Sequence, residues 1–155
     1  MFQNVGDEMC HHCNLPAGSR PNAARLFGNS PLKTYDLSVT VVPQFVPEQS
    51  DPGEQQFVFA YTVTITNTGE QPAQVISRHW IITDGNHREH EVRGLGVVGK
   101  QPLLAPGETF EYTSGCPLPT PVGSMRGSYH CVGENGIPFE VQIAEFVLAM
   151  PRTLH

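Results

Sequence analysis

The stretch FVFAYTVTIT at residues 57–66 places an aromatic or β-branched side chain at every odd-numbered position. Threonine occupies positions 62, 64 and 66 between them. Successive side chains of a strand point to opposite faces, so this alternation predicts a strand with one buried and one polar face. The following Asn67-Thr68-Gly69-Glu70 has the composition of a turn and ends the predicted strand.

Similar alternation continues on both sides of this stretch. The predicted strands are 35–41, 57–66, 73–83, 88–92, 109–113, 125–131 and 139–150. Glycine and proline concentrate between them, and a loop is predicted at 115–123. In the last strand the apolar positions change parity after Ile143, which predicts a β-bulge near Ala144 and Glu145. Seven strands without a convincing helix predict an all-β antiparallel sandwich.

Three residues favour immunoglobulin-like packing within this class. Trp80 lies on the third predicted strand, where such sandwiches bury a tryptophan. Tyr129 precedes Cys131 by two residues on the sixth strand, which is the spacing of a tyrosine corner. The second strand offers no cysteine to pair with Cys131, so packing alone is expected to hold the two sheets together.

Composition excludes several classes of function. The chain has 155 residues, enough for one domain with its own core, and its formal net charge is −6. The nine basic residues are scattered, which disfavours direct binding of nucleic acid, because that binding depends on clustered Lys and Arg. No apolar run has the length of a membrane span, and the N-terminus lacks the pattern of a signal peptide. A cytoplasmic protein with free thiols is therefore expected.

Residues 1–32 differ from the rest and show no sustained periodicity. They predict a disordered N-terminal extension, and Met9 offers an alternative translation start. The extension contains Cys10-His11-His12-Cys13, four residue types that bind soft metals. No second cysteine pair follows to complete a zinc site, so an incidental tail sequence is the favoured interpretation and a tail metal site the alternative.

Several short motifs together carry a resemblance to a known family. They are FVFAY at 57–61, SRHW at 77–80, GLGVVGKQP at 94–102, PGE at 106–108, YTSG at 112–115 and VLAMPRTLH at 147–155. Residues 33–155 resemble the ApaG domain on these motifs, whereas residues 1–32 lie outside the resemblance.

The resemblance implies a fibronectin-III-like sandwich in a bacterial protein encoded near diadenosine-tetraphosphate hydrolase genes. It also implies a genetic association with cobalt resistance and magnesium efflux. Eukaryotic relatives are domains of an F-box protein and of a DNA-polymerase-delta-interacting protein, in which the domain looks like a protein-binding module.

The glycines of the motif at 94–102 match a dinucleotide-binding fingerprint as a string: Gly94, Gly96 and Gly99, followed by Lys100. The fingerprint requires a helix after the glycines, but two prolines follow within seven residues. A tight corner of the sandwich is the favoured interpretation. An alternative is that consecutive amides of this loop form an anion site for pyrophosphate or a nucleotide.

His79 and His130 fall on predicted neighbouring strands and have the opposite parity to Trp80 and Tyr129. Both imidazoles are therefore expected on one outer face, where they could bind Co²⁺ or Ni²⁺. The alternative is a pair of solvated surface histidines. The sequence contains no catalytic motif with a nucleophile and base at the required spacing, so no enzyme activity and no cofactor are expected.

These observations predict a non-enzymatic binding module with a protein partner that the sequence does not name. Apolar loop residues are candidates for an exposed binding patch, and some of them are expected in the core: Phe45, Val46, Val97, Val98, Leu103 and Leu104. The alternative function is a protein linked to Co²⁺ or Mg²⁺ homeostasis that binds a metal or an anion. An exposed edge strand makes a homodimer a further expectation.

Overall fold

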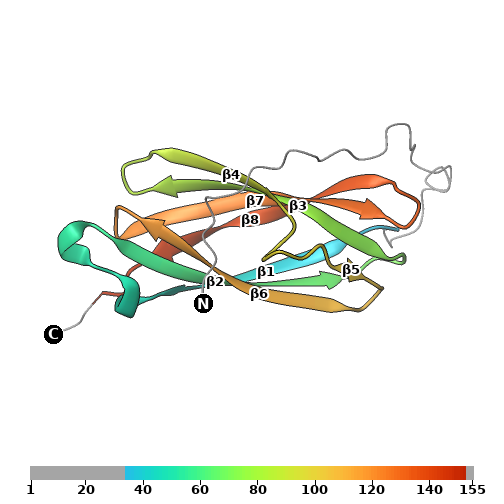
Figure 1. The fold of residues 1–155 in the computed structure, drawn as a ribbon, viewed down its shortest axis with the longest axis horizontal. Helices are drawn as coiled ribbons and strands as arrows, with labels where there is room; N and C mark the ends of the chain where they lie inside the picture. The colour runs from blue at the N-terminus through green and yellow to red at the C-terminus, as the bar shows by residue number, and fades with distance from the viewer. Residues whose placement is uncertain (1–33, 153–155) are drawn as a thin grey trace.

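The computed structural model describes residues 34–152 as two antiparallel sheets packed face to face (Figure 1). The predicted tail and its Cys10–His11–His12–Cys13 motif lie outside the described residues. The three-stranded sheet has the order β1-β2-β6, and the five-stranded sheet has the order β4-β3-β7-β8 with β5 beside β3. The strands are β1 Leu37–Phe45, β2 Phe57–Asn67, β3 Ala73–Asp84, β4 Glu89–Leu95, β5 Leu103–Leu104, β6 Thr109–Leu118, β7 Val122–Gly133 and β8 Pro138–Ala149. The predicted all-β sandwich is confirmed.

The loop between β1 and β2 contains two single-turn 3₁₀ helices, η2 at Pro47–Gln49 and η3 at Pro52–Glu54. In the described part of the chain, no helix is long and apolar enough to cross a membrane.

The loop predicted at 115–123 is wrong, because β6 continues to Leu118 and β7 already begins at Val122. Proline is compatible with a strand when its nitrogen does not have to donate to the ladder. Pro117 lies opposite Val58, and the bond from the Asn67 N–H to the Glu108 carbonyl shows which β6 residues face β2. By alternation, the nitrogen of Pro117 points away from β2, so the strand loses no bond.

Two bulges adjust the five-stranded sheet. Between Met125 and Gly127 on β7, the register of β8 jumps from Phe146 to Ile143, so Ala144 and Glu145 form the predicted bulge. The second bulge, at Ile76 on β3, was not visible in the sequence pattern. The carbonyl of Ile76 accepts hydrogen bonds from the Gly96 N–H at 2.7 Å and from the Gln101 side chain at 3.0 Å. This bulge therefore anchors the loop that follows β4.

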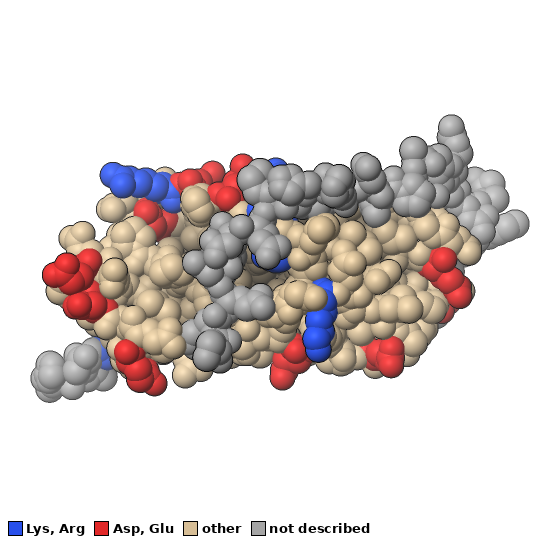
Figure 2. Space-filling view, viewed as in Figure 1, with Lys and Arg blue, Asp and Glu red and all other residues tan. Residues whose placement is uncertain are grey.

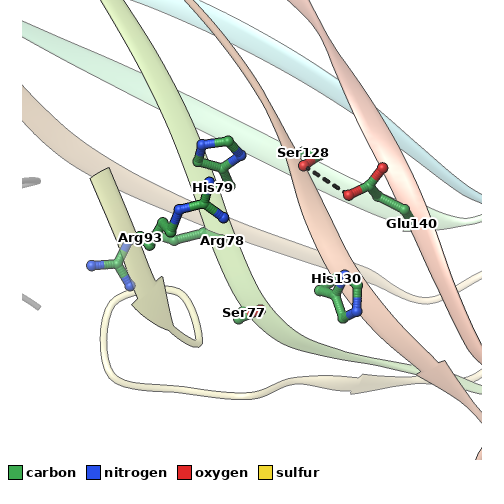
Figure 3. Close-up of a pocket in the computed structure, with 7 residues that line it drawn as sticks. All are labelled: Ser77, Arg78, His79, Arg93, Ser128, His130 and Glu140. Carbon is green, nitrogen blue, oxygen red and sulfur yellow. Dashed lines mark hydrogen bonds between the residues drawn. The ribbon is translucent and has the colours of Figure 1, made fainter. Parts of the chain in front are cut away.

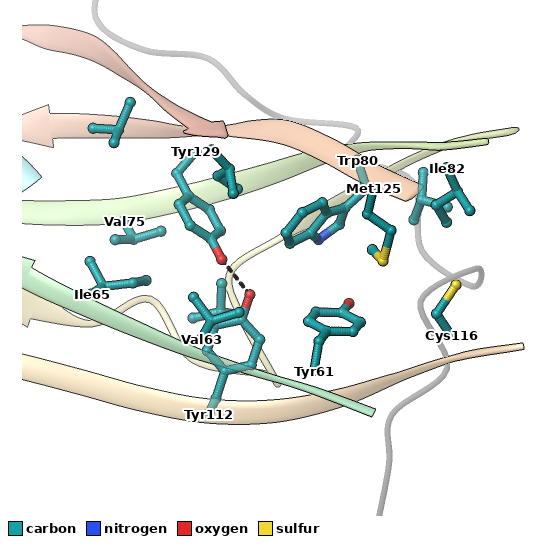
Figure 4. Close-up of a cluster of buried hydrophobic side chains, with 14 of the residues drawn as sticks. Tyr61, Val63, Ile65, Val75, Trp80, Ile82, Tyr112, Cys116, Met125 and Tyr129 are labelled. Atoms are coloured by element: carbon teal, nitrogen blue, oxygen red, sulfur yellow. Dashed lines mark hydrogen bonds between the residues drawn. The ribbon is translucent and has the colours of Figure 1, made fainter. Parts of the chain in front are cut away.

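Trp80 lies at the centre of the core and is fully buried, as predicted (Figure 4). Its indole meets Tyr61, Tyr129 and Phe146 edge-on, with ring centroids 5.4–6.3 Å apart. Aromatic edge-to-face contacts of this kind add to the stabilisation that burial alone provides. The two sheets are thus joined by ring packing, with Tyr61 from one sheet and the other three rings from the second.

The predicted tyrosine corner is wrong, because the hydroxyl of Tyr129 has a different hydrogen-bond partner from the one that such a corner requires. The hydroxyl of Tyr129 on β7 hydrogen-bonds to the hydroxyl of Tyr112 on β6, across the two sheets, and not to a backbone group (Figure 4). Burial raises the pKa of Tyr112 to about 12 and raises the pKa of Tyr129 well above its ordinary value. Both hydroxyls therefore stay neutral at physiological pH, and each satisfies the other inside the core.

This hydroxyl pair gives a testable prediction. Either Tyr112→Phe or Tyr129→Phe leaves one buried hydroxyl without its partner and lowers the free energy of unfolding by about 1–3 kcal/mol. The double variant removes both polar groups, so its loss should be smaller than the sum of the two single losses. Urea denaturation of the four proteins measures this coupling. Strictly additive losses would show that the two hydroxyls do not depend on each other.

Candidate functional site

A partly open depression of about 340 Å³ lies on the outer face of the five-stranded sheet, away from the core. Side chains from all four long strands of that sheet surround it (Figure 3). The lining residues are Ser77, Arg78, His79, Arg93, Ser128, His130 and Glu140.

Strand register explains this gathering. His79 on β3 lies opposite Ser128 on β7, and Ser77 lies opposite His130, so the two histidines are diagonal neighbours on one face. Arg93 on β4 lies opposite His79. Because the side chains of His79 and Trp80 alternate, burying the indole places the imidazole outside. The prediction that both histidines face outward is confirmed.

Glu91 lies on edge strand β4 and contacts two residues that line the depression. Its carboxylate lies 2.7 Å from Nε2 of His79 and 3.6 Å from a guanidinium nitrogen of Arg93. The hydrogen bond with His79 lowers the pKa of the Glu91 carboxyl, and the positive charges of Arg93 and Arg126 act in the same direction. Glu91 is therefore an anion held beside cationic groups, in a position that is open to solvent.

The carboxylate that lines the depression, that of Glu140, also has hydrogen-bond partners. Glu140 accepts hydrogen bonds from Ser128 at 3.4 Å and from Gln142 at 2.9 Å. Within residues 34–152, no three or more His, Cys, Asp or Glu side chains are grouped so that they could hold a metal ion. His79 and His130 offer two imidazoles, and metal binding by this pair stays a prediction that the geometry does not strengthen.

The loop at 94–100 forms the corner that the sequence favoured. Val97 and Lys100 exchange both backbone hydrogen bonds, at 2.7 and 3.0 Å, across a turn with Val98 and Gly99 at its centre. Both central residues have positive φ, 44° for Val98 and 78° for Gly99, as in a type I′ turn. A β-branched residue rarely adopts this conformation, so Val98 stores backbone strain that the surrounding packing must hold.

The geometry does not favour the alternative anion site on this loop. The amides of Gly96, Val97 and Lys100 already bond to carbonyls of the chain, so they do not form a set of free donors. Gly94 serves packing instead, because a Cβ at this position would lie 2.6 Å from the Arg78 guanidinium. That guanidinium donates to the carbonyls of Leu95 at 3.1 Å and Gly96 at 3.0 Å.

The predicted exposed apolar patch is wrong for Val46, Val97 and Leu104, which are buried, whereas Leu103 is exposed. Val97 is fully buried and belongs to the hydrophobic core. Phe45 packs on Phe59, with ring centroids 5.4 Å apart, and Val98 is partly buried against the same core. Val97 therefore contributes to stability and not to a binding surface, while Phe45 and Val98 are half-buried.

Two buried thiols have no catalytic chemistry. Cys116 on β6 and Cys131 on β7 are free cysteines in the core. Burial raises the pKa of each thiol to about 12. Because the thiolate is the reactive form, neither residue is a nucleophile at neutral pH.

The sequence analysis did not predict that the four edge strands differ in whether they contain a proline or a bulge. Pro43 lies in edge strand β1, and the bond from the Val46 N–H to the Val58 carbonyl shows that even-numbered β1 residues face β2. The nitrogen of Pro43 consequently points to the open side, as does that of Pro117 on β6. Edge strand β8 contains the Ala144–Glu145 bulge. Prolines and bulges are devices that block the addition of another strand.

Strand β4 is the one long edge strand of the described structure with neither device. Its even-numbered residues face β3, as bonds from the Asp84 N–H to the Arg88 carbonyl and from the Gly96 N–H to the Ile76 carbonyl show. The N–H and C=O groups of Glu89, Glu91 and Arg93 therefore point outward from the sheet. Acidic and basic side chains gather along this margin of the molecule (Figure 2).

Comparison with known proteins identifies the family to which this fold belongs. The family model described as the ApaG domain (DUF525) matches residues 47–133, which include β4 and most of the depression. The chain belongs to the ApaG family. This confirms the resemblance that the sequence motifs carry.

Relatives with the ApaG name are highly similar over nearly their whole length. Protein ApaG of Bordetella pertussis is 82% identical over 125 residues, which is 81% of this chain and 95% of that protein. Protein ApaG of Dechloromonas aromatica is 63% identical over 121 residues, covering 78% and 95%. A crystal structure from Bordetella pertussis that carries the name ApaA protein has 81% identity and a TM-score of 0.77, and it covers 79% of this chain and all of that one.

Proposed function

We propose that this ApaG-family chain is a non-enzymatic protein-interaction module that binds an extended segment of a partner along strand β4. The proposal rests on a difference among the four edge strands of the two sheets. Two carry a proline directed outward and a third carries a bulge, whereas the outward backbone groups of β4 are free of both. An edge strand without a proline or a bulge has outward N–H and C=O groups that can pair with an added strand.

The chemistry of the neighbouring face suits such a partner. In strand addition, backbone hydrogen bonds supply affinity, and pockets beside the edge select alternate side chains. Arg93 and Glu91 border the edge, and His79 lies next to them within the depression. The depression is lined by polar and charged residues and is partly open to solvent, which fits a side chain of a peptide better than it fits an enclosed small molecule.

Proline at position 91 tests the proposal. Glu91→Pro removes an N–H that points away from β3, so it blocks strand addition and leaves the β3–β4 ladder intact. Glu91→Gln removes the same charge and keeps the N–H. We expect proteins that the full-length wild type captures from a lysate to be captured by the glutamine variant and lost with the proline variant.

Circular dichroism and urea denaturation establish that both variants are folded before the capture experiment. Retention of the same proteins by a folded Glu91→Pro variant would refute strand addition at β4. Equal loss with Glu91→Gln would show that the Glu91 charge matters and the backbone does not.

A further inference from the structure

We propose that the strand that fits the β4 edge is the β4 strand of a second copy of this chain, paired antiparallel about a two-fold axis at Val92. The proposal rests on the proposed function, because it takes β4 as the docking strand and names the partner. Joined in this way, the two five-stranded sheets become one continuous sheet across the dimer.

The backbone of β4 is symmetric about this axis. The strand spans Glu89–Leu95, so Val92 is its central residue. With Val92 opposite Val92 of the second copy, Glu91 lies opposite Arg93 and Glu89 lies opposite Leu95. These four are the residues whose N–H and C=O groups point outward, so both pairs fall at hydrogen-bonding positions of the new ladder. The Glu91–Arg93 pairs carry the interface, because the Leu95 carbonyl already accepts from the Arg78 guanidinium.

The charges of Glu91 and Arg93 also favour the pairing register centred on Val92. Glu91 and Arg93 are exposed on the outer face, and the axis at Val92 sets each against the opposite charge of the second copy in both halves of the interface. A two-fold axis at Glu91 would place Glu91 against itself, and an axis at Arg93 would place two arginines together. An axis at His90 would set Glu89 against Glu91. Like charges directly opposite destabilise an antiparallel pair, whereas opposite charges stabilise it.

The other edges limit the assembly to two copies. A two-fold interface uses the same surface on both subunits and closes on itself. The remaining long edges carry Pro43, Pro117 and the bulge at Ala144 and Glu145, which disfavour pairing with a further copy. The structure therefore predicts a closed dimer and not a growing filament.

A charge-swap experiment on the full chain tests the register. Sedimentation equilibrium measures dimer dissociation for the wild type, Glu91→Arg, Arg93→Glu and the double variant. Each single change sets like charges against each other twice, and we expect the dimer to weaken by about tenfold or more. The double variant restores opposite charges in the register centred on Val92, so its dimer should recover to near the wild-type strength.

Three outcomes separate this inference from the proposed function. A wild type that stays monomeric at every concentration, while Glu91→Pro still abolishes lysate capture, would overturn the self-pairing and leave β4 as the docking strand. A double variant as weak as the single variants would overturn the register. A wild-type dimer that Glu91→Pro does not weaken would overturn the self-pairing, because the dimer interface would then lie elsewhere, and the capture experiment would still decide the proposed function.

Discussion

Replacing Trp80 with alanine should lower the free energy of unfolding by about 3–5 kcal/mol, which is among the largest effects of a single change in this fold. The indole is fully buried, and it is the ring against which Tyr61, Tyr129 and Phe146 pack. Alanine would leave a cavity between the two sheets that these neighbouring rings could fill only in part. Urea denaturation followed by circular dichroism measures the loss.

Two control variants distinguish cavity formation from a general effect of substitution. Trp80→Phe keeps a ring in the site and should cost less than Trp80→Ala. Leu103→Ala removes an apolar side chain that is 63% exposed and should change stability little. A Trp80→Ala protein with the urea midpoint of the wild type would mean that the core is not organised around this residue.

Val97→Asp is expected to prevent folding at neutral pH. The side chain of Val97 is 0% exposed, so a carboxylate there would lose its hydration without gaining a partner charge. The cost of an unpaired buried charge is several kcal/mol, which is comparable with the whole stability of a typical domain. The same substitution on an exposed apolar surface would leave the fold intact, so this variant tests whether Val97 is buried.

Leu103→Asp is the matched control for this variant, because Leu103 follows in the same connection but is mostly exposed. It should fold with nearly wild-type stability, as judged by its urea midpoint and its amide spectrum. If Val97→Asp also folds normally, Val97 is not buried, and the exposed patch predicted from the sequence becomes tenable again.

The strands and the core could be predicted because burial on one face imposes a period of two on the sequence. The alternation at 57–66 identified β2, and the change of parity after Ile143 located the bulge at Ala144 and Glu145. The isolated indole of Trp80 on a predicted inner face was enough to place it in the core.

Loops and long-range pairs could not be predicted in this way. A loop has no period, so nothing in the sequence near Val97 distinguishes a buried valine from an exposed one. The pairing of Tyr112 with Tyr129 depends on which strands face each other across the sandwich, and the bulge at Ile76 depends on the loop that bonds to its carbonyl.

The candidate site was predictable in part. Parity alone placed His79 and His130 on the outer face, but the contact between His79 and Glu91 requires the pairing of β3 with β4. The sequence also contains a signal that identifies two of the edge strands. Pro43 and Pro117 lie within alternating segments, and a proline inside a strand pattern indicates an edge.

Amide hydrogen exchange in strand β4, measured on the full chain in dilute and in concentrated solution, tests the account most directly. Val92 donates to β3 and serves as the internal control, because its amide should exchange slowly in both solutions. We predict that the amides of Glu91 and Arg93 exchange rapidly when the protein is dilute and become protected when it is concentrated. If they exchange rapidly at every concentration while Val92 stays protected, β4 does not pair with a second copy of the chain.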